Sequence, residues 1–140
     1  MKMNQSTNIL QRNIYDPIFK EKFLLVGSCI LTMYTDILKE FTKEWKDYVT
    51  YCLEIGHYNK LHSKLAAILG TGNTKKMAFL TVDGSPHCVQ MHYLSKYLKR
   101  ELKSKVNFSH FVISEDGIVY KVDMDDINKS NLLALVGKKY

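Results

Sequence analysis

Residues 77–94 read MAFLTVDGSPHCVQMHYL, and this stretch decides between the folds that the sequence allows. Its first six residues are an apolar run, which predicts a buried strand. The run ends at Asp83-Gly84-Ser85-Pro86, a sequence that favours a turn or a cap. Reactive side chains follow at once, namely His87, Cys88 and His92.

Two structures fit the residues after this turn. Ser85 and Pro86 are typical of a helix N-cap and first position, which predicts a helix with its leucines facing inward. Alternatively, residues 83–86 form a hairpin turn and 87–93 form a strand, since apolar and polar residues alternate there. Residues four apart lie about 6 Å apart on a helix but about 13 Å apart on a strand. Cys88 and His92 can therefore share a site only in the helical case.

The first half of the chain has a helical pattern. Asp16-Pro17 predicts the start of a short helix that runs through about Val26. Beyond it, apolar residues recur at steps of three and four, which predicts a long amphipathic helix over about 29–55. A second helix is expected over about 58–69, where glycines follow. The long helix would present an aromatic stripe of Tyr34, Phe41, Trp45 and Tyr48.

The second half has a strand pattern. Residues 107–114 and 117–122 predict a hairpin, and 132–136 fit a final strand or a helical turn. We therefore expect an α+β fold in which an N-terminal helical layer packs on a small mixed or antiparallel sheet, with one further helix at about 93–105. Residues 1–140 would form a single domain with a polar tail at 1–14, a helical half at 15–70 and a strand-containing half at 77–137.

In the hairpin case the order of elements over residues 57–137 becomes α-β-β-α-β-β-β. That order resembles the roadblock type of small regulatory domain, whose members dimerise and serve as scaffolds for GTPases. The resemblance is one of topology, and the helical segment before residue 57 departs from the family pattern, so the identity of a partner is not carried over.

Composition excludes several classes of protein. The longest apolar stretches of the 140 residues are far shorter than the roughly 20 residues of a membrane-spanning helix, and residues 1–12 are too polar for a signal peptide. Three cysteines, Cys29, Cys52 and Cys88, have no CxxC spacing, so neither a disulfide framework nor a zinc knuckle is indicated. We expect a cytoplasmic protein with reduced thiols.

Positive charge is concentrated in the middle of the chain. Residues 55–113 hold nine lysines and arginines against two acidic residues, while the flanking segments are nearly neutral. A localised basic surface attracts nucleic acid, a phosphorylated ligand or an acidic protein face. The function that we expect first is a non-catalytic binding or regulatory module, acting as a homo-oligomer, that contacts such a partner. The expected contact residues are Gly84, Ser85, Lys96, Lys99, Arg100 and Lys103.

Two other functions remain open. Cys88, with His87 or His92, would suit a thiol- or metal-dependent redox enzyme or sensor, because a helix N-terminus stabilises a thiolate. Alternatively, the aromatic stripe would attach the protein as a structural subunit to a larger assembly. No cofactor is predicted. A metal ion has only Cys88 and His92 as local ligands, and Gly84 is not followed by the further glycines of a dinucleotide fingerprint.

Overall fold

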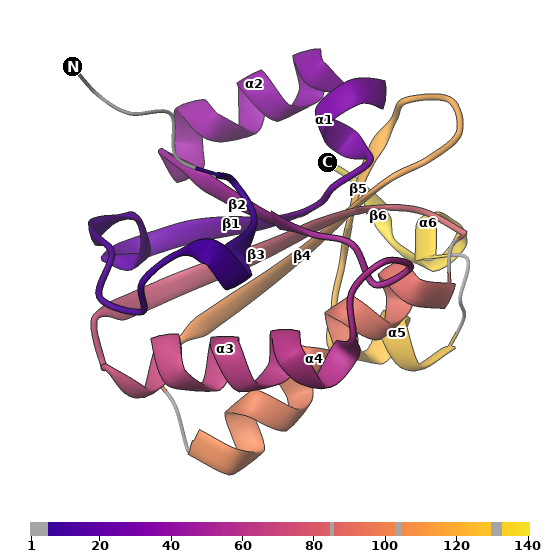
Figure 1. Cartoon of the computed structure of the whole chain (residues 1–140). Helices are drawn as coiled ribbons and strands as arrows, with labels where there is room; N and C mark the ends of the chain where they lie inside the picture. Colours follow the sequence, from indigo (N-terminus) through magenta and orange to yellow (C-terminus); the bar gives the residue numbers. More distant parts are fainter. Residues whose placement is uncertain (1–5, 85, 103–104, 130–132) are drawn as a thin grey trace, which may run out of the picture.

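The computed structural model describes residues 6–84, 86–102, 105–129 and 133–140. In this part of the chain six strands form one sheet in the order β2-β1-β3-β4-β5-β6 (Figure 1). The first four positions in this order are parallel, whereas β5 and β6 run antiparallel to their neighbours. The strands are β1 (Glu21–Gly27), β2 (Tyr48–Tyr51), β3 (Thr74–Val82), β4 (Asn107–Ile113), β5 (Val119–Val122) and β6 (Lys138–Lys139).

Helices cover both faces of this sheet (Figure 1). One face carries α1 (Ile30–Met33) and α2 (Thr35–Trp45), and the other carries α3 (Tyr58–Gly70) and α4 (Pro86–Leu102). Two short helices, α5 (Met124–Lys129) and α6 (Leu133–Val136), lie beside β4 and β5. The 3₁₀ turns η1 (Ile9–Gln11) and η2 (Pro17–Phe19) precede β1.

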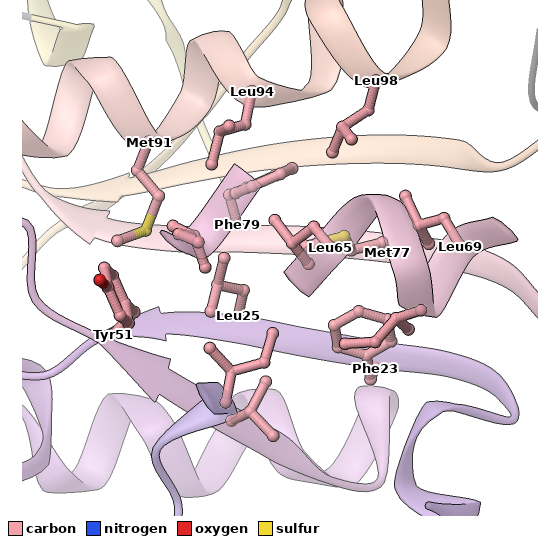
Figure 2. Close-up of a cluster of buried hydrophobic side chains, with 14 of the residues drawn as sticks. Phe23, Leu25, Tyr51, Leu65, Leu69, Met77, Phe79, Met91, Leu94 and Leu98 are labelled. Atoms are coloured by element: carbon pink, nitrogen blue, oxygen red, sulfur yellow. The ribbon is translucent and has the colours of Figure 1, made fainter. Parts of the chain in front are cut away.

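The central strands are buried on both sides. Phe23 and Leu25 of β1 face α3 and α4, while Leu24 and Val26 face α1 and α2. Figure 2 shows the first of these cores, in which leucines of α3 and α4 point toward the sheet. A strand buried on both faces has a continuous apolar sequence, as β1 and β3 do.

This architecture contradicts the expected fold class. The chain does not form the expected N-terminal helical layer on a small mixed or antiparallel sheet, because β1 and β2 from the first half are strands of the same six-stranded sheet as β3 and β4. The parallel order also contradicts the roadblock-like topology, in which 87–93 would be a strand. Residues 86–102 instead form the single helix α4, which confirms the helical alternative for this segment. The helix expected at 93–105 therefore begins earlier, at Pro86.

The long helix predicted for 29–55 is wrong. Its helical period is real over α2, where Leu38, Phe41 and Trp45 are buried against the sheet. Lys46, however, has φ +66°, which ends the helix, and residues 48–51 continue as β2. Tyr48, Val49 and Cys52 fit the helical spacing by coincidence. The short helix expected at 17–26 is also wrong, because only η2 forms before β1 begins.

Several other elements are confirmed. The helix expected at 58–69 is α3, the strand expected at 77–82 lies within β3, and β4 and β5 form the expected hairpin. For residues 132–136, the described part is the helix α6.

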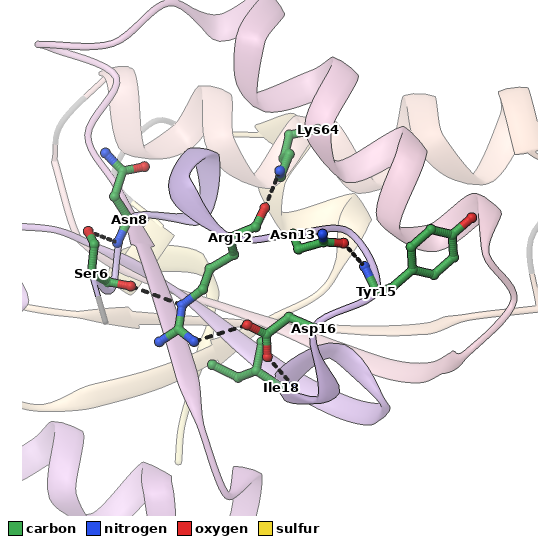
Figure 3. Close-up of polar contacts among 8 residues, drawn as sticks. All are labelled: Ser6, Asn8, Arg12, Asn13, Tyr15, Asp16, Ile18 and Lys64. Atoms are coloured by element: carbon green, nitrogen blue, oxygen red, sulfur yellow. Dashed lines mark hydrogen bonds and ion pairs between the residues drawn. The ribbon is translucent and has the colours of Figure 1, made fainter. Parts of the chain in front are cut away.

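The segment before β1 is held by its own polar contacts (Figure 3). Arg12 donates to the carbonyl of Ser6 at 2.9 Å and pairs with Asp16 at 3.2 Å. Asp16 caps η2 by accepting a hydrogen bond from the backbone of Ile18 at 2.9 Å. Lys64 of α3 donates to the carbonyl of Arg12, and the segment is thereby fixed to the helical layer.

None of the helices in the described part of the chain combines the length and apolar character needed to cross a membrane.

Candidate functional site

The path of the chain creates a crevice at the carboxyl ends of the parallel strands. After β1 the chain passes through α1 and α2 to β2 on one side, and the later strands β3 and β4 lie on the other side of β1. The connections that follow β1 and β3 therefore leave on opposite faces of the sheet (Figure 1). In doubly wound sheets such a topological switch point is the usual place for a ligand.

A cavity of about 210 Å³ lies at this point. Its walls come from the ends of β1, β2 and β3 and from the first turns of α4. The lining residues are Gly27, Ser28, Cys29, Tyr51, Cys52, Leu53, Glu54, Val82, Cys88 and Met91. We call this cavity the switch-point crevice.

All three cysteines of the chain line the switch-point crevice. Cys29 lies directly before α1, Cys52 directly after β2, and Cys88 in the first turn of α4. Each is a thiol in the structure, with Cys29 exposed and the other two half-buried. The fold therefore brings together three residues that the sequence gives no reason to group.

Partial burial and acidic neighbours act on the titrating groups of the crevice. Burial raises the pKa of the Cys29 thiol; backbone hydrogen bonds oppose this rise, and the nearby Cys52 and Glu54 add to it. Burial also raises the pKa of the Tyr51 hydroxyl, with a further contribution from Cys52. The Tyr51 hydroxyl donates to the carbonyl of His57 at 2.7 Å, which fixes its ring in the wall of the crevice.

His92 lies in the core beneath the crevice rather than on its surface. It is fully buried between α4 and the sheet, and both of its ring nitrogens are engaged. Its Nε2 lies 2.8 Å from the Thr81 hydroxyl, and its Nδ1 lies 2.8 Å from Nδ1 of His110. The imidazole is therefore already occupied by partners other than Cys88.

The hydrogen bonds around this histidine pair fix the positions of the protons. Ser95 donates to the carbonyl of His92 at 3.1 Å, so its oxygen accepts from Nε2–H of His110 at 3.1 Å. Nδ1 of His110 must then accept from Nδ1–H of His92, whose Nε2 accepts from Thr81. Burial and the neighbouring His110 lower the pKa of His92 well below its usual value, and burial lowers the pKa of His110 to about 4.

The described contact residues expected at one site do not all lie together, because Gly84 lies before α4 and the basic residues lie toward its C-terminal end. Gly84, which adopts φ +88° in the turn, lies before the helix, while Lys96 and Lys99 line a separate cleft near its other end. Arg100 is exposed. Ser85 and Lys103 lie outside the described residues, and for His87 only the backbone, within α4, is described.

Four residues of the crevice were not predicted as site residues from the sequence, namely Cys29, Cys52, Tyr51 and Glu54. The signal that could have found them is positional, since Cys29 and Cys52 each follow closely after a strand. The carboxyl ends of neighbouring parallel strands meet at one edge of a sheet. Recognising β1 and β2 as strands would have placed both cysteines there.

Comparison with known proteins agrees with this topology. A family model for a Rossmann-like domain matches residues 16–137, which is most of the chain. The chain belongs to the Rossmann-like domain family. No curated protein and no solved structure matches it.

Many domains with this architecture bind a dinucleotide at a glycine-rich turn that leads from the first strand into a long helix. In this Rossmann-like domain the turn is Gly27-Ser28-Cys29, without the further glycines, and α1 has only four residues. The crevice, at about 210 Å³, is also smaller than the roughly 300–1,000 Å³ typical of ligand pockets. These residues do not fit a dinucleotide bound in that way.

A metal ion has no preformed site in the part of this Rossmann-like domain that is described. No three of its described His, Cys, Asp or Glu side chains are placed to hold one ion together. The reactive side chains that line the crevice are the thiols of Cys29, Cys52 and Cys88.

Proposed function

We propose that this Rossmann-like domain is a thiol-dependent redox sensor or enzyme whose site is the switch-point crevice. The supporting observation is that all three cysteines of the chain, which come from three separate connections, line this one cavity. The cavity also lies at the topological switch point, where folds of this kind bind their ligands.

We assign the reaction with substrate to Cys88. It lies in the first turn of α4, a 17-residue helix whose N-terminus carries partial positive charge and favours a thiolate. Cys29 suits this role less well, because its partial burial and its acidic neighbours Cys52 and Glu54 raise its pKa and so disfavour its thiolate. His92 is not assigned as a base for Cys88, because its two ring nitrogens are already bonded to Thr81 and His110.

The substrate class that fits is a small disulfide. The Cys88 thiolate attacks one sulfur of the disulfide, the sulfur–sulfur bond breaks, and the second sulfur leaves as a thiolate that takes a proton from water. The product is a mixed disulfide on Cys88. Leu53, Val82 and Met91 give the crevice apolar walls that can hold the carbon part of such a molecule.

The reaction of the reduced protein with oxidised glutathione tests this proposal. Mass spectrometry should find one glutathionyl group on Cys88, formed at least tenfold faster than in Cys88→Ser, where the remaining thiols would have to react. Cys29→Ser and Cys52→Ser are the matched controls, and each should still form the mixed disulfide at Cys88. Equal rates of modification in the parent and in Cys88→Ser would refute the assignment.

A reducing compartment suits this function, because the thiols must be regenerated between cycles. We therefore propose a cytoplasmic location.

A further inference from the structure

We propose that Cys29 and Cys52 form a reversible disulfide across the ends of β1 and β2, which makes this pair a modification site distinct from Cys88. The inference rests on the proposed function and extends it. The small disulfide that modifies Cys88 would also oxidise Cys29 and Cys52 to a disulfide in the same crevice. The inference rests on the backbone register of the two strands and on the common cavity of the two thiols.

The register brings the two backbones close together. Gly27 of β1 pairs with Tyr51 of β2, and the ladder continues for one more hydrogen bond, from the Ser28 amide to the Tyr51 carbonyl at 3.1 Å. Cys52 thus lies opposite Ser28, one residue away from Cys29. Cys29 itself has turned out of the ladder, with φ −63° and ψ −24°, so its side chain does not follow the alternation of the strand and faces the same cavity as Cys52. With about 4.8 Å between the strands and about 3.8 Å from Ser28 to Cys29, the Cα atoms of Cys29 and Cys52 are on the order of 6–8 Å apart, near the upper limit for a disulfide.

The two side chains share one environment. Both line the switch-point crevice, and the charge of Cys52 acts directly on the titration of Cys29.

The surrounding backbone leaves room for the bond to close. Cys29 precedes α1, a helix of only four residues, and Cys52 begins the turn that connects β2 to α3. Neither cysteine lies inside a strand or a long helix, so a small rotation of either side chain does not break the sheet. Cys88, in contrast, lies within the long helix α4.

The exchange is balanced with a small disulfide as the oxidant. The Cys52 thiolate attacks it, one thiolate leaves, and a mixed disulfide forms on Cys52. Cys29 then loses its proton and attacks Sγ of Cys52, and the second thiolate leaves. Two thiols are oxidised to one protein disulfide, and the small disulfide is reduced to two small thiols.

Tryptic peptide mapping tests the inference, because each cysteine falls in a different peptide. Cleavage after lysines separates residues 23–39, 47–60 and 77–96, which carry Cys29, Cys52 and Cys88, respectively. The full chain is equilibrated in glutathione buffers of increasing oxidation, blocked with N-ethylmaleimide and digested. We expect a linked pair of peptides 23–39 and 47–60, which should disappear on reduction.

The variants separate the inference from the function on which it rests. Cys29→Ser and Cys52→Ser should lose the linked pair, whereas Cys88→Ser should form it at the same buffer potential as the parent. A link from peptide 77–96 to either of the others, or mixed disulfides with no link, would overturn the inference. A linked pair with no modification of Cys88 would support the Cys29–Cys52 disulfide and refute the role of Cys88. Modification of Cys88 with no linked pair would support the role of Cys88 and refute the disulfide.

Discussion

At the scale of single residues, the buried histidine pair has a structural consequence for pH dependence. The bond between the two Nδ1 atoms needs one nitrogen with a proton and one without, so protonation of His110 at Nδ1, the accepting nitrogen, breaks it. His92 and His110 are 0% and 5% exposed; their ring nitrogens bond to Thr81, Ser95 and each other, and the charge of Asp123 raises the pKa of His110 by less than burial lowers it. The histidine pair therefore links α4 to β4 only while His110 is neutral, and His92 accepts from Thr81 of β3 only while His92 is itself neutral.

We expect the free energy of unfolding to fall as the pH is lowered from about 6.5 toward 4. The unfolded histidine has a pKa near 6.5 and the folded His110 has one of about 4, so stability from His110 is complete above 6.5 and is lost on the way down. The loss from His110 is about 3 kcal/mol. Urea unfolding at several pH values measures it.

Two variants isolate the histidine contribution from that of the carboxylates. His110→Gln should be less stable than the parent at pH 7 but should show a shallower dependence on pH between 6.5 and 4. His57→Gln, at an exposed position, should keep the parent's dependence. Parallel curves for the parent and His110→Gln would contradict the expectation.

Gly56 is a second residue with a defined steric role. A Cβ at this position would overlap the hydroxyl and ring of Tyr51, which lines the switch-point crevice. We expect Gly56→Ala to destabilise the protein by about 1–3 kcal/mol, since the ring must move and release its bond to His57. Gly70→Ala is the control, because no atom lies near its Cβ and alanine favours the end of α3. Thermal unfolding compares the two variants. Equal melting temperatures would show that the Tyr51 ring moves aside without loss of stability.

At the scale of elements, α4 shows what the sequence could predict. Ser85-Pro86 and the spacing of Met91, Leu94 and Leu98 favour a helix, and α4 begins at Pro86 with these three residues buried. The same residues also fit a strand over 87–93. Only tertiary packing distinguishes the two, because the sheet already has β4 beside β3.

β1 shows why the rest could not be predicted. Phe23-Leu24-Leu25-Val26 is apolar at every position, so it has neither the period of a helix nor that of a half-buried strand. Asp16-Pro17 favours the start of a helix, and Asp16 does cap the helical turn η2, but this turn has only three residues. Unless β1 and β2 are recognised as strands, nothing in the sequence places Cys29 and Cys52 beside Cys88.

The packing of α4 predicts a contrast between two of its positions. Leu98 is fully buried against the sheet, so Leu98→Ala should lower the free energy of unfolding by about 2–5 kcal/mol. Lys99 is exposed, and Lys99→Ala should change it by at most about 0.5 kcal/mol. Chemical denaturation of both variants measures the difference. Similar losses in the two would mean that α4 does not pack as the structure has it.

At the scale of the whole molecule, the aromatic residues of α2 already have a partner. Phe41 and Trp45 are 4% and 6% exposed and cover the chain's own sheet, with Phe41 in edge contact with Phe111. The surface of the opposite layer is different, since Lys60, Lys99 and Arg100 are exposed there. An acidic partner would therefore meet α3 and α4 rather than α2.

Contact of this basic surface with nucleic acid stays a prediction, and its salt dependence would test it. If about four phosphates are neutralised, a plot of log affinity against log salt should have a slope of roughly −3 to −4. Fluorescence anisotropy with a labelled oligonucleotide measures the slope. Charge reversal at Lys99 and Arg100 should make it shallower, and affinity that does not change with salt would exclude this partner.

The position of β1 within the sheet sets an order of events during synthesis. Both of its neighbours, β2 and β3, come later in the chain, so β1 leaves the ribosome before either strand that will pair with it. Its apolar run, residues 23–26, stays without a hydrogen-bonded neighbour until residue 51 has emerged and keeps one open edge until residue 82. A nascent chain that has not yet reached residue 82 therefore exposes an apolar strand with an unpaired edge. Chaperones bind segments of this kind, and without a chaperone such segments tend to aggregate.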